Sequence, residues 1–186
     1  MTSTLLPATV EHRTVNRLQL ECAVAGNPGQ PLVILLHGFP DIWQTWRYQI
    51  GPLAAAGFRV LAPNQRGYGK SSRPCGIAAY DIDHLAQDVI ALADLEGYST
   101  FSLVGHDWGG IVAWWVAAMF PQRVARLAIL NAPHPGAFCR YLLRRPTQLL
   151  RSWYVAFFQL PWLPEKMLSR NHFEPLIRSM RAEARA

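Results

Sequence analysis

The segment Gly105-His106-Asp107-Trp108-Gly109-Gly110 constrains the fold more than any other part of the sequence. The apolar run before it, residues 100–104, predicts a buried strand, and the run after it, residues 111–120, predicts a helix. Glycines around a strand-to-helix turn permit a sharp bend that pushes one side chain out over the sheet. The pattern therefore predicts a nucleophile elbow with Asp107 as the exposed residue.

Asp107 decides which chemistry such an elbow could support. A carboxylate cannot run serine-type acyl transfer, but it can attack a saturated carbon and form an alkyl ester. The alternative is that Asp107 only caps the following helix, a common role for aspartate. A cap needs none of the flanking glycines Gly105, Gly109 and Gly110, so the sequence favours the catalytic interpretation.

Apolar runs separated by turn residues predict alternating strands and helices along the rest of the chain. Asp81 or Asp83 can cap one helix, whose apolar residues recur at helical spacing. The other expected elements are a hairpin at 9–25, strands at 31–37, 58–62 and 126–131, a helix at 46–56 and a loop at 67–76. This alternation predicts an α/β fold with a doubly wound, mostly parallel sheet.

The character of the sequence changes near residue 134. Residues 1–133 carry no net charge, whereas residues 134–186 carry the whole net charge of +6 and are expected to be helical. We therefore predict a core at 1–133 and a second domain at 134–186. The basic residues fit a solvated helical face, since no nucleic-acid motif accompanies them and no apolar run is long enough to span a membrane.

The cysteines and the N-terminal residues indicate the cellular compartment of the protein and whether it holds a metal. Cys22, Cys75 and Cys139 are odd in number and widely spaced, which indicates reduced thiols and not a disulfide framework or a zinc site. The N-terminal residues lack the basic and long apolar segments of a signal peptide. We expect a cytoplasmic protein with no metal and no cofactor.

A second motif, His37-Gly38-Phe39-Pro40, ends the strand at 31–37. Such a turn leaves a backbone N–H, here that of Phe39, free to point into a pocket. Together with the N–H of Trp108 at the start of a helix, it would form an oxyanion hole. The simpler alternative is an ordinary strand-ending turn.

Two other features have modest expected roles. His106 precedes Asp107 and should point away from the exposed side, so we expect it to be packed and hydrogen-bonded. The segment Arg66-Gly-Tyr-Gly-Lys-Ser-Ser-Arg73 lacks the spacing of a phosphate-binding P-loop, and a surface loop is the better interpretation.

In order along the chain, His37-Gly-Phe-Pro40, Arg66-Gly-Tyr-Gly69 and Gly105-His-Asp-Trp-Gly-Gly110 resemble the motifs of the epoxide hydrolases in the α/β-hydrolase superfamily. The resemblance covers roughly residues 9–165. It implies an α/β-hydrolase fold, truncated here after the start of a helical lid that begins at residue 134. It also implies a small, apolar, epoxide-like substrate.

The resemblance assigns roles residue by residue. Asp107 matches the nucleophile, and the N–H groups of Phe39 and Trp108 match the oxyanion hole. Tyr154 matches a lid tyrosine that protonates the leaving oxygen, and Phe39, Trp108 and Tyr154 are expected to contact substrate. The family's relay acid and general-base histidine have no counterpart in this sequence, and His172 is a poor substitute.

Two alternatives remain open, and one further property is expected. A haloalkane dehalogenase would share the nucleophile and the ester, although Phe39 stands where many of them have Asn. A non-catalytic fragment or binding module would use the same Trp-lined pocket without turnover. The strand at 126–131 should lie at a sheet edge, through which we expect self-association.

Overall fold

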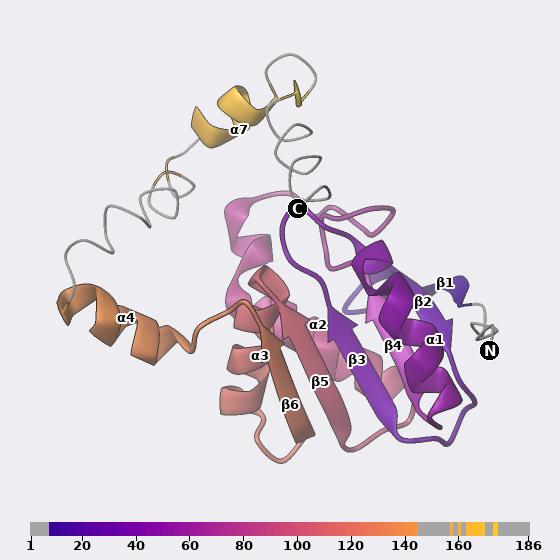
Figure 1. Ribbon diagram of the computed structural model, residues 1–186. Coiled ribbons are helices and arrows are strands. Elements are labelled where there is room, and N and C mark those ends of the chain that lie inside the picture. Colours follow the sequence, from indigo (N-terminus) through magenta and orange to yellow (C-terminus); the bar gives the residue numbers. More distant parts are fainter. Residues whose placement is uncertain (1–7, 145–156, 158–159, 161–162, 170–172, 175–186) are drawn as a thin grey trace. The chain divides into compact units, whose positions relative to one another are not determined.

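A computed structural model describes residues 8–144, 157, 160, 163–169 and 173–174. The chain divides into two compact units, Met1–Pro135 and Gly136–Ala186. The first unit is an α/β structure (Figure 1) whose elements are β1 (Thr9–Val15), β2 (Leu18–Ala25), β3 (Leu32–Leu36), η1 (Trp43–Trp46), α1 (Arg47–Ala55), β4 (Arg59–Pro63), η2 (Ile77–Tyr80), α2 (Ile82–Leu95), β5 (Phe101–His106), α3 (Trp108–Met119) and β6 (Val124–Leu130).

The sheet has six strands in the order β1-β2-β4-β3-β5-β6. Strands β3, β4, β5 and β6 pair in parallel, and β2 pairs antiparallel with both β1 and β4. Asn16 and Arg17 form the hairpin turn with positive φ angles of 50° and 64°, which matches the twist of the flanking strands. The α/β sheet predicted from the sequence is confirmed.

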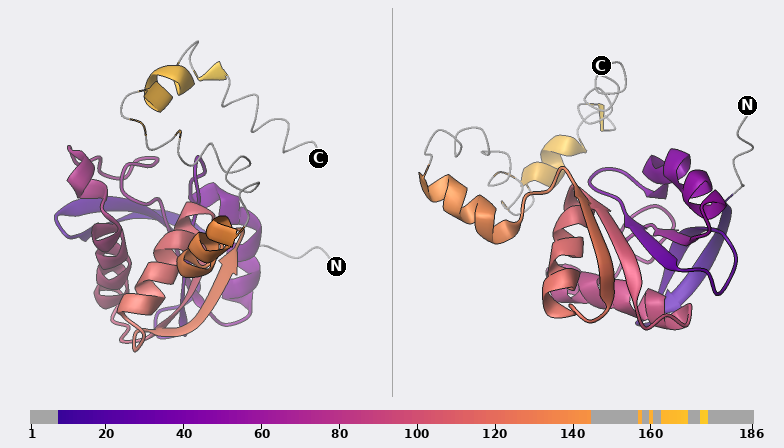
Figure 2. Two further views of the ribbon diagram at one scale, coloured as in Figure 1. Left: turned by 90° about the vertical axis from the view of Figure 1, so that its left-hand side faces the viewer. Right: turned by 60° about the horizontal axis from the view of Figure 1, so that its bottom comes forward.

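Strand β3 is buried on both faces, which explains its uninterrupted aliphatic sequence. Leu32, Ile34 and Leu36 belong to a core shared with α2 and α3. Val33 and Leu35 belong to a second core that contains residues of α1. Helix α1 therefore covers one face of the sheet, and α2 and α3 cover the other (Figure 2).

The strand order reverses at β3, because β4 lies on one side of it and β5 on the other. In open α/β sheets the crevice at such a reversal, beyond the carboxyl ends of the strands, is the usual ligand site. Gly38 follows the end of β3 and Asp107 follows the end of β5. The topology thus brings the two sequence motifs to one point.

Two helix boundaries sharpen the sequence predictions. Asp81, and not Asp83, caps α2, because its carboxylate accepts the N–H of Ile82 at 2.8 Å. Helix α3 begins at Trp108, three residues before the predicted start at 111. Gly109 and Gly110 favour helices poorly, but here both are buried within the first turn.

The second unit contains helix α4 (Pro135–Arg144), which begins at the junction, and the short helix α7 (Leu163–Leu168). Among the residues that the structure describes, no helix is long and apolar enough to cross a membrane.

Candidate active site

The backbone of Asp107 adopts the conformation of a nucleophile elbow. Its φ of 51° and ψ of −119° are unusual for a residue with a side chain, and such strain persists only where the surroundings enforce it. The N–H of Asp107 donates to the carbonyl of Leu130 at 3.0 Å, and its carbonyl accepts from the N–H of Ile111 at 3.1 Å. The elbow is therefore held by β6 on one side and by α3 on the other.

Gly38, Gly105 and Gly109 allow the turn after β3, the end of β5 and the start of α3 to pack closely around Asp107. A Cβ on Gly105 would collide with the backbone of Gly109, and a Cβ on Gly109 would collide with the carbonyl oxygens of Leu36 and His37. A Cβ on Gly38 would lie 2.6 Å from the Cβ of Asp107. No larger residue fits at these three positions. Their small size allows the turn after β3 to pack against the elbow.

The carboxylate of Asp107 faces the motif that follows β3. Its Oδ1 accepts the backbone N–H of Phe39 at 3.0 Å. Although Asp107 occupies the N-cap position of α3, its side chain makes no capping hydrogen bond. Phe39 is 39% exposed and Trp108 is 48% exposed, so both neighbours of the elbow present apolar surface to solvent. The amides at the start of a 12-residue helix also favour a negative charge here.

His37 lies next to this arrangement and contacts the backbone of both Gly38 and Gln65. Its side chain is fully buried, and that burial lowers the pKa of the imidazole. Nδ1 lies 2.9 Å from the carbonyl oxygen of Gly38, and Nε2 accepts the backbone N–H of Gln65 at 3.1 Å. The side-chain amide of Gln65 donates to the carbonyl of His37 at 2.7 Å.

Tyr68 packs the edge of its ring against His37, with the ring centroids 4.7 Å apart. Burial raises the pKa of the Tyr68 hydroxyl to about 12, and the negative charges of Asp107 and Asp41 add to the shift. Neither Gln65 nor Tyr68 was identified as a site residue from the sequence. Tyr68 lies inside the Arg66-Gly-Tyr-Gly69 motif, but spacing alone does not show that this loop reaches His37.

The comparison with protein families agrees with the geometry, because residues 31–186 match the family model described as alpha/beta hydrolase fold. The chain belongs to the α/β-hydrolase family.

Relatives of this α/β-hydrolase include Epoxide hydrolase 4 from Homo sapiens, at 45% identity over 86% of this chain and 44% of that protein. The AB hydrolase superfamily protein YfhM from Bacillus subtilis is 44% identical over 87% of this chain and 56% of that protein. The crystal structure of Bacillus megaterium epoxide hydrolase in complex with an inhibitor superposes with a TM-score of 0.86 at 33% identity, covering 93% of this chain and 60% of that one.

These similarities confirm the resemblance to epoxide hydrolases, and the chain is an epoxide hydrolase-like α/β-hydrolase. It spans about half the length of the curated relatives that it matches.

The remaining sequence predictions for this α/β-hydrolase have different outcomes. Arg66 is buried and bound by both carboxylate oxygens of Asp88 at 2.7 Å, and it also donates to the carbonyl of His84. This ion pair holds the loop after β4 in place. Because the guanidinium of Arg66 is already bound to Asp88, the loop fits a structural role and not a phosphate site. Cys22 and Cys75 are free thiols.

His106 matches its predicted role only in part. Its Nε2 lies 3.5 Å from the amide nitrogen of Asn131, but its buried Nδ1 has no hydrogen-bond partner. Tyr154 and His172 lie outside the described residues. Within the part of the chain that the structure describes, no group of His, Cys, Asp and Glu could hold a metal ion.

Proposed function

We propose that this α/β-hydrolase opens epoxides through a covalent ester on Asp107. The observation that carries the proposal is the hydrogen bond from the Phe39 N–H to Asp107 Oδ1, made by a carboxylate that leaves its own helix uncapped. A carboxylate held through Oδ1 leaves Oδ2 to act as the nucleophile. That arrangement suits attack on carbon and has no use in capping.

In the proposed first step, Asp107 Oδ2 attacks a carbon of the epoxide and forms a C–O bond. The bond from that carbon to the ring oxygen breaks, and the ring oxygen leaves with the electron pair. It takes a proton from an acid, for which we propose the hydroxyl of Tyr154, and the product is a hydroxyalkyl ester of Asp107. We propose that the exposed rings of Phe39 and Trp108, together with Tyr154, contact the apolar substrate.

The second step needs a base. Hydroxide generated from water would attack the ester carbonyl, and negative charge would develop on the oxygen that the Phe39 N–H contacts, assisted by the N–H of Trp108. The acids that follow Asp107 in the sequence are Glu165, Glu174 and Glu183. None of them matches the relay acid of the family, so we expect the 186-residue polypeptide to form the ester and release diol slowly.

Two other functions use the same residues. A dehalogenase-like enzyme would form an alkyl ester from an alkyl halide, and halide would leave with the electron pair without needing a proton. A binding module would hold an apolar molecule against Phe39 and Trp108 without reacting. Intact-protein mass separates all three outcomes.

In the experiment, one sample of the protein is incubated with styrene oxide and a parallel sample with a primary alkyl chloride, and the intact-protein mass of each is measured over time. Epoxide opening adds the full mass of the epoxide, because every atom of the ring is retained. Halide displacement adds only the alkyl group. We expect the epoxide adduct to form faster than the alkyl adduct; the reverse order would favour the dehalogenase, and no adduct at all would favour the binding module.

A further inference from the structure

The peptide unit between Gly38 and Phe39 is hydrogen-bonded at both ends. Its carbonyl oxygen lies 2.9 Å from Nδ1 of His37, and its N–H donates to Asp107 Oδ1 at 3.0 Å. A peptide unit is planar, so fixing the direction of the carbonyl also fixes the direction of the N–H. Hydrogen bonding to the carbonyl oxygen further polarises the N–H on the other side of the unit.

The partners of His37 define one protonation state. A carbonyl oxygen can only accept, so Nδ1 must carry the proton that it shares with Gly38. A backbone N–H can only donate, so Nε2, which faces Gln65, must be unprotonated. Both contacts are satisfied together only by the neutral imidazole with its proton on Nδ1. Full burial of the side chain also disfavours the charged form.

The ring cannot easily turn away from this position. Gln65 binds His37 twice, through its backbone N–H and through its side-chain amide, and Tyr68 packs edge-on against the imidazole. The backbone carbonyl oxygen of His37 lies 2.5 Å from the position that a Cβ on Gly109 would take, so the start of α3 packs against the backbone of His37. His37 is therefore held between the loop after β4 and the start of α3.

We propose that His37 is a positioning residue, whose Nδ1–H orients and polarises the Gly38–Phe39 peptide so that its N–H holds Asp107 Oδ1. Gln65 fixes the tautomer that this requires. The inference rests on the proposed function of Asp107 for its effect on reaction rate, but the alignment itself is a property of the resting protein.

The test compares His37→Leu, which removes both ring nitrogens, with His37→Asn, whose side-chain amide can replace the Nδ1 donor. His12→Leu is the matched control, because it makes the same change on the exposed surface of β1. One measurement is the amide-proton NMR shift of Phe39, and the other is the rate of Asp107 alkylation by styrene oxide. Circular dichroism checks that each variant is folded.

In His37→Leu we expect the Phe39 amide signal to move upfield and alkylation to slow by roughly tenfold to a hundredfold, because Asp107 is no longer held in the geometry for attack. His37→Asn should recover most of both properties, and His12→Leu should change neither. A folded His37→Leu variant with an unchanged Phe39 signal would overturn the proposal.

A measurement on the unaltered protein covers the case in which His37→Leu does not fold. Nitrogen-15 NMR of the histidine rings should show His37 protonated at Nδ1 and bare at Nε2 at neutral pH. The opposite tautomer, or a charged ring, would overturn the proposal. Failure of styrene oxide to alkylate the wild type would count against the proposed function alone, because both NMR measurements are independent of reaction.

Discussion

The two sides of strand β5 differ sharply. On the β3 side, backbones approach so closely that Gly38 and Gly109 have no room for a methyl group, and Asp107 is held in a strained conformation. On the other side, β6 is the outermost strand of the described sheet, and Ala125, Arg126, Ala128 and Leu130 are all exposed. Among the described residues, packing is therefore closest where the candidate nucleophile is held, and the adjoining strand β6 is more exposed than β3.

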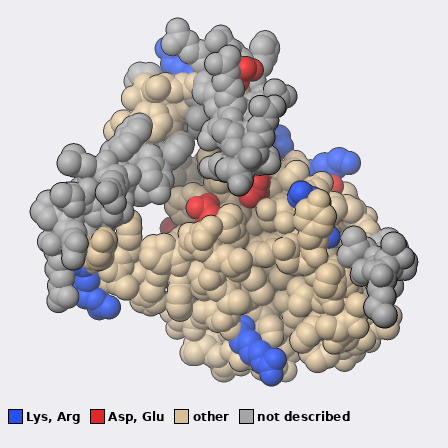
Figure 3. Space-filling view, in the orientation of Figure 1, with Lys and Arg blue, Asp and Glu red and all other residues tan. Residues whose placement is uncertain are grey.

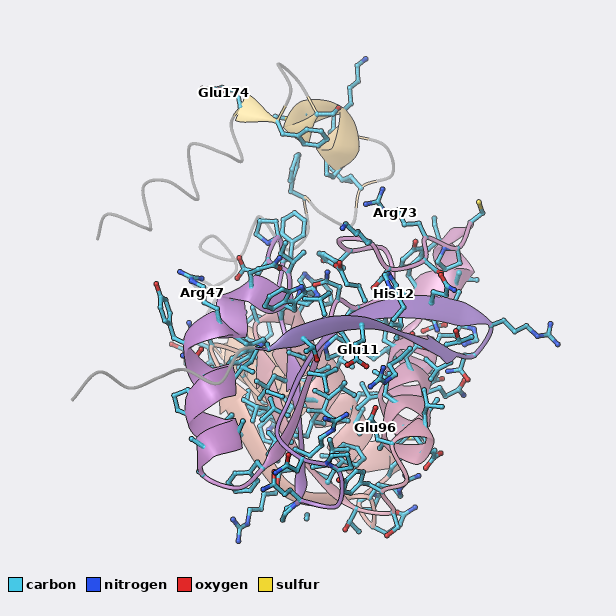
Figure 4. All side chains as sticks on the ribbon, turned by 90° about the vertical axis from the view of Figure 1, so that its right-hand side faces the viewer. Glu11, His12, Arg47, Arg73, Glu96 and Glu174 are labelled. Carbon is cyan, nitrogen blue, oxygen red and sulfur yellow. The ribbon has the colours of Figure 1, made fainter. Side chains whose placement is uncertain are left out.

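The two edges of the sheet differ as well. Strand β1 carries Glu11 and His12, which are labelled in Figure 4. It also carries Arg13, which binds Glu96 at 2.7 Å. Strand β6 is mostly apolar, and charged side chains are sparse over the described part of the face in Figure 3. Charge on an edge strand opposes strand addition, so we propose that self-association occurs through β6 and not through β1.

The largest expected effect is loss of stability when the close approach beside Asp107 is filled. We expect Gly109→Ala to destabilise the fold by more than about 3 kcal/mol, since the methyl group meets backbone carbonyls and not a movable side chain. Gly97→Ala is the matched control: its Cβ would meet nothing, but its φ is 84°, so we expect a loss of about 1–2 kcal/mol. Urea unfolding measures both. Equal losses would show that space beside Asp107 is not limiting.

The next prediction concerns the buried ion pair between Arg66 and Asp88, which holds the loop after β4. Asp88→Asn leaves the Arg66 guanidinium buried without its carboxylate, which should cost about 3–5 kcal/mol. Asp94→Asn breaks the Arg123 ion pair, where the carboxylate is 59% exposed, and should cost about 0–1 kcal/mol. Comparable unfolding free energies for the two variants would contradict the assigned role of Arg66.

A pH-dependent effect is expected at the charged edge. Burial raises the pKa of Glu96, but hydrogen bonds from Arg13 and Arg59 outweigh it, so the pKa lies below the ordinary value of 4.5. Stability from Glu96 is therefore present above pH 4.5 and is lost as the pH falls through the lower folded-state value. Glu96→Gln should cost about 1.5–3 kcal/mol at pH 7 and less in acid. A penalty independent of pH would contradict this.

The smallest effect on stability, within about 0.5 kcal/mol, is expected for a charge on the open edge. Leu130→Lys should leave unfolding almost unchanged while it reduces self-association in sedimentation velocity. Val10→Lys makes a similar change on β1, where the side chain is 48% exposed, and should not alter association. If Leu130→Lys associates like the wild type, β6 is not the contact surface.

The elements of the core could be predicted because their signals are local. The aliphatic run of β3, the cap at Asp81 and the glycines around Asp107 each lie within a few residues of the structure that they specify. The resemblance assigned the Phe39 N–H to an oxyanion hole, which stays a prediction; in the structure this N–H donates to Asp107 Oδ1.

The contacts of His37 and Arg66 could not be predicted, because each joins segments that are distant in the sequence. Gln65 is 28 positions from His37, and Arg66 is 22 positions from Asp88. Nothing in the spacing of these residues shows that they meet until the sheet is assembled. The early start of α3 has a similar origin, because buried packing of Gly109 and Gly110 overrides their low helix propensity.

The central claim is that Asp107 is a nucleophile and not a cap, and peptide mapping after exposure to an epoxide tests it most directly. The protein and its Asp107→Asn variant are incubated with styrene oxide, digested and analysed by mass spectrometry. We predict one adduct on the peptide that contains Asp107 in the wild type, and no adduct there in Asp107→Asn, which should unfold like the wild type. An adduct of equal yield in Asp107→Asn, or one confined to another residue, would contradict the account.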